Sequence, residues 1–203
     1  MIRIVACLAI SLVVFISISF AQASEWHVDR SYDRNSVQFT SEVLGFSFSG
    51  KTKVIDGFIY SPHHDFVSAG AAFYFEVDLN DIDSGIGRRD RDMRKILETA
   101  EWPKATFAGK ISHISPDSLK RDRYELTASG KLKIKGIEKN LDLVATLDRH
   151  TRRLIISANF PVRLNDYKIA APTLAAFIKV SEIIEMDVQF AMASVVREKE
   201  GAE

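Results

Sequence analysis

The chain of 203 residues carries 27 basic and 27 acidic side chains, so its formal net charge is zero. This balance argues against nucleic acid as the main partner, because nucleic-acid-binding domains are normally strongly basic. The one cysteine, Cys7, lies within the first 23 residues. The rest of the chain therefore has no thiol, which excludes disulfide bonds, thiolate nucleophiles and cysteine-bound zinc there.

Residues 1–23 have the three parts of a secretory signal peptide. Arg3 supplies the positive charge, residues 4–20 form a short apolar run, and Ala21-Gln22-Ala23 offers small residues at a cleavage site. We predict cleavage after Ala23 and export to the periplasm. The alternative is an N-terminal anchor that is not cleaved.

No internal repeat or Pro/Gly-rich linker divides the remaining chain, so we expect one domain over residues 24–195 and a charged tail at residues 196–203. Its dominant feature is the alternation of apolar and polar residues, which is typical of antiparallel strands with one buried face. About eight such strands should form an all-β sandwich or barrel. In chain order the strands are expected near Ser36–Glu42, Lys53–Tyr60, Phe73–Asn80, Thr106–Ser115, Leu126–Lys135, Leu141–Leu147, Leu154–Leu164 and Ile178–Met192.

One segment follows a helical period instead. Between Ile86 and Leu97 the apolar residues are spaced as on one face of a helix, and the other face is rich in arginine. Asp83 and Ser84 are expected to cap its N-terminus by accepting hydrogen bonds from free backbone N–H groups. The basic face could make transient contact with an anionic membrane surface. The simpler interpretation is an exposed helix whose arginine and aspartate side chains pair with one another.

The sequence gives little support for catalysis. The five histidines are scattered, and His63-His64 next to Asp65 fits a solvated turn better than a metal site. No serine lies in a nucleophile-elbow pattern. We therefore predict no catalytic residue, no metal site and no cofactor, and keep as an alternative an enzyme that uses His113 or Asp90 as acid or base.

Six motifs follow one another along the chain after residue 23. They are Trp26-His27-Val28-Asp29, Asn35-Ser36-Val37-Gln38-Phe39, Gly50 with Gly57-Phe58-Ile59, Arg89-Asp90, the run from Trp102-Pro103 to Phe107, and the run from Gly130 to Lys139. In this order they resemble the motifs of the YceI-like family of exported polyisoprenoid-binding proteins, over nearly the whole chain after residue 23. The sequence departs from the family pattern at Asn35, where histidine is usual, at Val43, near the place of a second histidine, at Thr52, where phenylalanine is expected, and at Lys168, where glycine is expected. These departures affect the mouth and the headgroup end of any pocket.

The resemblance implies a lipocalin-like antiparallel barrel of about eight strands with one short inserted helix. It also implies a long isoprenoid, isoprenoid quinone or fatty-acyl chain as ligand, held by a periplasmic carrier or reservoir rather than an enzyme. An eight-stranded barrel is wide enough either to fill with side chains or to hold one small ligand. A solid barrel that acts through protein partners is therefore an alternative, as is an outer-membrane barrel, although a charged tail and a helix argue against the latter. The oligomeric state stays open.

Alternation together with the resemblance places large aromatic residues on the inner face. We expect a ligand to contact the inward-facing phenylalanines, with a tryptophan near the mouth. The predicted ligand-binding residues are Phe39, Phe48, Phe58, Phe73, Phe75, Trp102, Phe107 and Phe160.

Overall fold

The computed structural model describes residues 23–43, 45–62, 66–171, 173–174 and 178–195. Residues 1–22 of the predicted signal peptide, the charged tail from residue 196 and the His63-His64 turn lie outside these residues. The strands are β1 (Ser24–Val28), β2 (Ser36–Val43), β3 (Phe46–Thr52), β4 (Ile55–Ser61), β5 (Ala72–Asp78), β6 (Lys104–Pro116), β7 (Arg123–Ile134), β8 (Ile137–His150), β9 (Arg153–Arg163), β10 (Thr173–Leu174), β11 (Ile178–Lys179) and β12 (Ile183–Ser194). The helical elements are α1 (Gly87–Ile96) and two short 3₁₀ turns, η1 (Leu79–Asp81) and η2 (Leu164–Tyr167).

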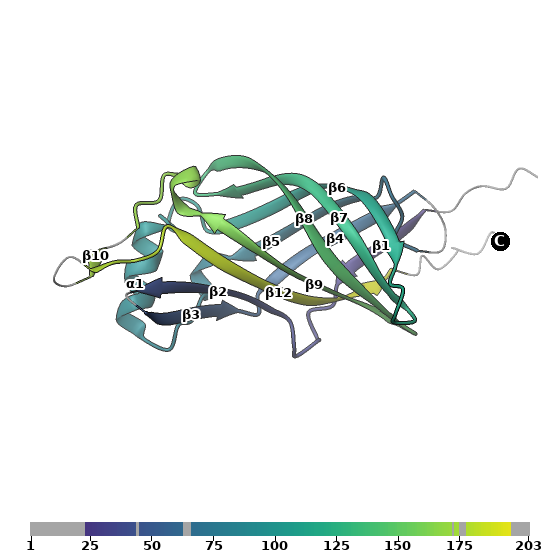
Figure 1. Ribbon diagram of the computed structural model, residues 1–203, viewed down its shortest axis with the longest axis horizontal. Coiled ribbons are helices and arrows are strands. Elements are labelled where there is room, and N and C mark those ends of the chain that lie inside the picture. The colour runs from purple at the N-terminus through teal and green to yellow at the C-terminus, as the bar shows by residue number, and fades with distance from the viewer. Residues whose placement is uncertain (1–22, 44, 63–65, 172, 175–177, 196–203) are drawn as a thin grey trace, which may run out of the picture.

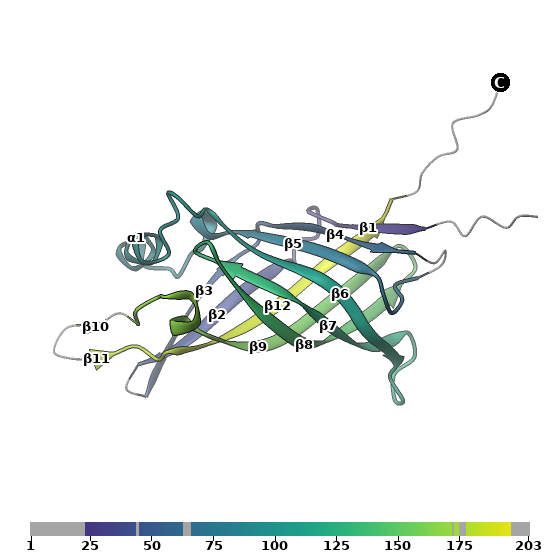
Figure 2. The same ribbon diagram turned by 90° about the horizontal axis from the view of Figure 1, so that it is seen from above.

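Eight antiparallel strands close into a barrel, as predicted. Their order around the ring is β1-β4-β5-β6-β7-β8-β9-β12, and β12 pairs with β1 to complete it. β12 pairs with β1 only near its C-terminus, and its N-terminal part pairs with β2, which forms a hairpin with β3. The barrel is elongated, with α1 and the hairpin β2–β3 at one end (Figures 1 and 2).

The alternating apolar faces point into the barrel. Along β9, for example, Leu154 and Ile156 are buried, and along β12 the same holds for Phe190 and Met192. Because strand side chains alternate between two faces, polar residues elsewhere on β12, such as Glu185 and Asp187, are exposed to solvent. An outer-membrane barrel has the opposite arrangement, with its apolar face turned outward.

Glycine is required at a close approach of the β6 and β7 backbones. Gly109 and Gly130 are direct partners in the sheet, and a Cβ atom on Gly109 would lie 2.1 Å from the backbone oxygen of Ser129. The next hairpin turns through Lys135 and Gly136, both with positive φ angles of 51° and 72°. Two residues with positive φ form a two-residue turn whose twist matches that of the flanking strands. The turn lies within the motif from Gly130 to Lys139.

The structure confirms the predicted helix to within one residue at each end. The predicted cap is wrong: no side chain caps the helix at Ile86, the N-cap residue. Instead Asp90, in the first turn, accepts hydrogen bonds from the backbone N–H and the hydroxyl of Ser84. In the part of the chain that the structure describes, no helix is long and apolar enough to cross a membrane.

Three strand predictions need correction. Alternation did not mark β1, which is one of the eight strands of the ring, whereas the predicted strand at Ser36–Glu42 is β2, which pairs with β12 outside the ring. Alternation did not mark β3 as a strand, because Ser47, Ser49 and Lys51 are separated by residues of mixed type. The run from Ile178 to Met192 was expected to be one strand. It is divided, because β11 pairs with β10 and only β12 belongs to the barrel.

Candidate ligand-binding cavity

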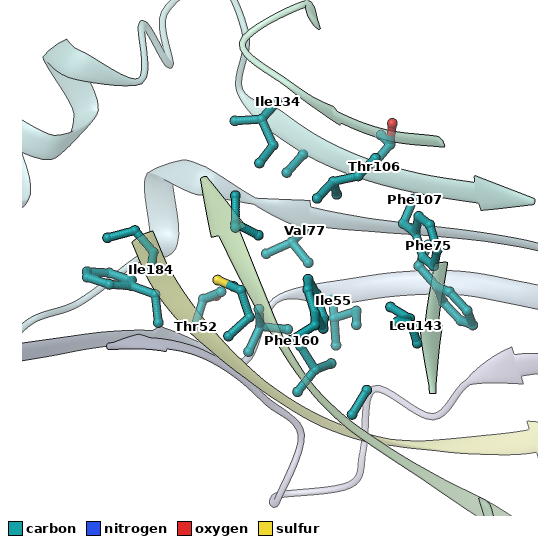
Figure 3. A pocket seen from close by; sticks show the side chains of 18 of the residues that line it. Thr52, Ile55, Phe75, Val77, Thr106, Phe107, Ile134, Leu143, Phe160 and Ile184 are labelled. Atoms are coloured by element: carbon teal, nitrogen blue, oxygen red, sulfur yellow. The ribbon is translucent and has the colours of Figure 1, made fainter. Parts of the chain in front are cut away.

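The barrel interior holds a cavity of about 300 Å³. This is the small end of the range of about 300–1,000 Å³ found for ligand pockets. Among the residues that the structure describes, every one that lines the cavity has an apolar side chain, except Thr52 and Thr106. Figure 3 shows Phe75, Phe107 and Phe160 converging on it from different strands.

The cavity exists because small side chains meet across neighbouring strands. Ala158 on β9 is paired directly with Ala145 on β8 and with Val188 on β12. All three line the cavity. In a fully packed barrel, large residues fill the interior opposite small ones. Here three small residues lie in a row, so space is left in the middle of the barrel.

One end of the barrel is solid. Ala71, Leu147, Leu154 and Met192 are each 0% exposed, and none of them lines the cavity. They belong to the same inward faces as the lining residues, further along the strands. This floor seals the end of the barrel where β1 pairs with β12. The floor closes this end of the cavity, and α1 lies at the other end of the barrel.

Helix α1 covers that other end with its apolar face. Met93, Ile96 and the following Leu97 line the cavity. The helix is held against β3 by Arg89, whose guanidinium carbon lies 4.8 Å from the centre of the Phe48 ring. Phe48 also lines the cavity. The helix thus forms part of the cavity wall and of its mouth.

A small polar network fixes the start of α1. Arg89 donates from Nε to the hydroxyl of Ser84 at 2.8 Å and from Nη2 to the backbone oxygen of Ser84 at 2.6 Å. Arg94 donates to the backbone oxygen of Asn80 at 2.9 Å. The hydrogen bond from the Ser84 hydroxyl, more than any other interaction, lowers the pKa of Asp90, and the nearby arginines add to this effect. The Arg-Asp motif therefore has a structural role in placing the helix.

Six of the eight predicted ligand-binding residues line the cavity: Phe39, Phe48, Phe73, Phe75, Phe107 and Phe160. Their predicted contacts with a ligand stay a prediction.

The inward placement of Phe58 is wrong. On β4, Ile55, Gly57 and Ile59 are buried, so Phe58 falls on the outer face and is 36% exposed. Its ring packs beside Tyr74, with the ring centres 6.1 Å apart.

Trp102 does not line the cavity either. It packs on the β7–β8 turn, where a Cβ atom on Gly136 would lie 2.8 Å from the indole Cζ2. A tryptophan in this position supports the turn by covering the one residue without a side chain.

The departures from the family pattern lie in different places. Asn35 is buried at the closed end, not at the mouth: its amide group donates to the backbone oxygen of Asp29, and its side-chain oxygen accepts from the backbone N–H of Ala191. Lys168 has a φ of 52° after η2, which explains why glycine suits this position. Thr52 lines the cavity, and its hydroxyl donates to Asp81 at 2.8 Å.

Sequence reasoning missed the aliphatic lining and the helix. Met186, Val162 and Ile156 occupy inward positions of predicted strands, so the alternation already contained this signal. Thr106 is the other threonine of the wall, and its hydroxyl makes no hydrogen bond within the described residues. That α1 contributes to the cavity could not be read from its sequence.

Neither residue considered for catalysis reaches the cavity. His113 is exposed on β6, beside an irregularity in its pairing with β7, and Asp90 is engaged with Ser84. Among the residues that the structure describes, no group of three or more histidine, aspartate and glutamate side chains could hold a metal ion. The cavity can bind through apolar contact and through little else.

A family model described as the YceI-like domain matches residues 26–192. A UPF0312 protein from Enterobacter sp. (strain 638) is 26% identical over 177 residues, which cover 82% of this chain and 87% of that protein. Protein YceI from Salmonella arizonae is 27% identical over 180 residues, with the same coverage of 82% and 87%.

Solved structures share the fold at lower sequence identity. A polyisoprenoid binding domain from Saccharophagus degradans has a TM-score of 0.68 at 18% identity and covers 84% of this chain and 98% of that chain. BcnA from Burkholderia cenocepacia has a TM-score of 0.65 at 17% identity, with coverage of 81% and 98%. The predicted lipocalin-like barrel is thus confirmed.

Proposed function

This chain belongs to the YceI-like family, and we propose that it is an exported protein that holds one long apolar chain inside its barrel. The proposed ligand is a polyisoprenoid, an isoprenoid quinone or a fatty-acyl lipid. The proposed role is that of a carrier or reservoir in the periplasm. The signal-peptide pattern of residues 1–23 supports export.

The observation that carries this proposal is the composition of the cavity wall, which contains no charged side chain and only two hydroxyl groups among the described residues. A ligand that needed several hydrogen bonds or an ion pair would lose its hydration here without replacement. A hydrocarbon chain has no such cost. The polyisoprenoid binding domain from Saccharophagus degradans shares this fold, which is consistent with such a ligand.

The shape of the cavity also favours a chain. On β12 the lining residues run from Ile184 to Phe190, a strand length of about 20 Å at the usual rise per residue. A volume of about 300 Å³ spread over that depth makes the cavity long and narrow. A compact ligand of the same volume would fit such a slot poorly.

A carrier needs only a small gain in free energy when a lipid moves into it from the membrane. Burying each methylene group yields about 0.8 kcal/mol relative to water. The competing environment is a bilayer, which solvates the chain equally well. The protein therefore needs only a small advantage over the membrane, and apolar contact alone can supply it.

The direct test is mass spectrometry of an organic extract from the protein purified from the periplasm without detergent. We expect a polyprenyl, quinone or acyl species in stoichiometric amount. A clean extract from well-folded protein that also takes up no such lipid when it is offered would overturn the proposal.

A pair of variants separates the cavity from the surface. Ala158→Phe places a ring in the middle of the cavity and should lower the lipid content of the extract severalfold. Val144→Phe adds a ring on the outside of β8, where Val144 is 53% exposed, and should leave the content unchanged. Equal lipid content in both variants, with both folded by circular dichroism, would contradict binding in the cavity.

A further inference from the structure

The outward face of α1 is basic and unpaired. Arg88, Arg91 and Lys95 are exposed, and their spacing of three and four residues places them on one side of the helix. None of the three forms an ion pair within the part of the chain that the structure describes. Asp92, the exposed acidic residue of this helix, also has no such pair there. On this outward face, the expected pairing of arginine with aspartate is therefore absent among the described residues.

Exposed apolar side chains lie at the same end of the barrel. Phe46, in the hairpin β2–β3, is 80% exposed, and Ile86, which precedes α1, is 54% exposed. Ile183, at the start of β12, is 41% exposed. Figures 1 and 2 show that the hairpin and α1 share this end of the long axis. Large apolar side chains left in water near one another mark a contact surface for a partner.

The positions of the two faces of α1 decide whether its basic residues meet the headgroup of a lipid bound in the cavity or an anionic membrane surface. Its inward face, with Met93, Ile96 and Leu97, lines the cavity. The basic side chains lie on the opposite side, so they do not reach into the cavity to meet the headgroup of a bound lipid. They can meet a flat anionic surface that the end of the barrel approaches.

We propose that the α1 end of the barrel docks on a bilayer that contains anionic phospholipid. Arg88, Arg91 and Lys95 contact the headgroups, and Phe46 and Ile86 enter the interfacial layer. The mouth of the cavity then faces the membrane, which lets an apolar chain pass without crossing water. This inference rests on the proposed function, because docking matters only if the cavity exchanges a lipid.

The expected size of the effect follows from membrane electrostatics. Each basic residue near an anionic surface contributes a factor of about five in affinity, so three together contribute about 100-fold. This contribution should weaken steeply as salt is raised, because the charges are exposed. The apolar contribution of Phe46 should not depend on salt.

Co-sedimentation with vesicles tests the proposal. Every strand of the closed barrel lies between Ser24 and Ser194, so the chain from Ser24 to Glu203 is used. It should bind vesicles of phosphatidylethanolamine and phosphatidylglycerol and bind vesicles of phosphatidylcholine far more weakly. The triple variant Arg88→Gln, Arg91→Gln, Lys95→Gln should bind the anionic vesicles about 100-fold less tightly.

A matched control has the same change of charge at the other end. Lys120 and Arg121 lie in the β6–β7 turn and Arg152 in the β8–β9 turn, all exposed and near the floor of the barrel. Their triple replacement by glutamine should leave vesicle binding nearly unchanged. Equal losses in the two triple variants would show that net charge, not the α1 face, causes binding, and would overturn the proposal.

The apolar contact has its own matched pair. Phe46→Ser should weaken binding to anionic vesicles, whereas Leu119→Ser, at a residue 92% exposed in the β6–β7 turn, should not. Lipid extracted from each variant is measured in parallel. Lipid in the extract without vesicle binding would refute docking but leave the proposed function intact. Vesicle binding with an empty extract would refute the proposed function.

Discussion

Replacing Asp90 with alanine should loosen α1 from the mouth of the cavity. Asp90 is 8% exposed and accepts two hydrogen bonds from Ser84, and Ser84 is also held by Arg89. A hydrogen bond to a charged group contributes about 1.5–3 kcal/mol. Ser84 is half-buried and can regain water when the carboxylate is removed, so we expect a net loss of about 2 kcal/mol rather than the full sum.

The effect should be confined to the helix and its surroundings. At the α1 end of the barrel, β3 is joined to the segment before α1 by an isolated bridge, in which Lys51 and Asp83 exchange two backbone hydrogen bonds of 2.9 Å. The seam between them is thus closed by few interactions. A loss of about 2 kcal/mol corresponds to about 30-fold more frequent opening, which amide hydrogen exchange across Gly87–Leu97 would detect.

The control is Asp92→Ala, which removes an exposed carboxylate from the same helix and should leave exchange within a few-fold of the wild type. The protection of β9 should be the same in both variants. Unchanged protection of α1 in Asp90→Ala would refute the assignment of Asp90 as the residue that fixes the helix.

The stabilisation of α1 by Asp90 should depend on pH, and its direction follows from the shifted pKa of Asp90. The pKa of Asp90 is lowered in the folded protein, so the stabilisation by its carboxylate is complete above the ordinary value of 3.8 and is lost as the pH falls through the lower folded value. Exchange rates of α1 in the wild type and in Asp90→Ala should therefore converge in acid. A constant difference down to the lowest pH at which the barrel stays folded would contradict this mechanism.

Three further predictions concern the barrel. Gly109→Ala should lower the free energy of unfolding by several kcal/mol, because its Cβ would overlap the backbone oxygen of Ser129; a melting temperature within a few degrees of the wild type would contradict this. Arg123 binds Asp148 through two hydrogen bonds of 2.6 and 2.7 Å, so Arg123→Gln should cost about 1 kcal/mol in denaturant unfolding above pH 4, with a smaller loss in acid, where the carboxylate is protonated. Burial raises the pKa of Tyr167 to about 12, so one tyrosine should ionise last in an absorbance titration, and its replacement by phenylalanine should remove that step.

The sequence predicts the barrel well because alternation is a local signal that a strand must obey along its whole length. β9 and β12 each place five or more apolar residues on one face, and that pattern fits no other element. Phe58 was wrongly placed on the inner face because it is a large aromatic residue, although the alternation along β4 places it on the outer face. Ile55 and Ile59 set the inward phase of β4, and Phe58 lies between them.

The cavity itself could not be predicted, because it depends on register between strands. Ala145, Ala158 and Val188 are far apart in the chain, and only the pairing of β8 with β9 and of β9 with β12 brings them into a row. A shift of one residue in any of these pairings would turn the small side chains to the outer face. The same limit applies to α1, whose apolar face was evident but whose position over the mouth is a tertiary feature.

We expect the two ends of the barrel to have different roles: the floor determines the stability of the fold, and the mouth determines the exchange of ligand. At the floor, β1 closes the ring on β12, and the buried Asn35 ties this corner together with hydrogen bonds to Asp29 and Ala191. At the mouth, closure depends on α1 and the seam beside β3. Because local openings in a protein can cost far less than global unfolding, a chain-like ligand could enter past α1 while the floor stays intact. This asymmetry predicts that variants at the floor change the melting temperature, whereas variants at Asp90 or Ser84 change the rate of ligand release with little effect on melting.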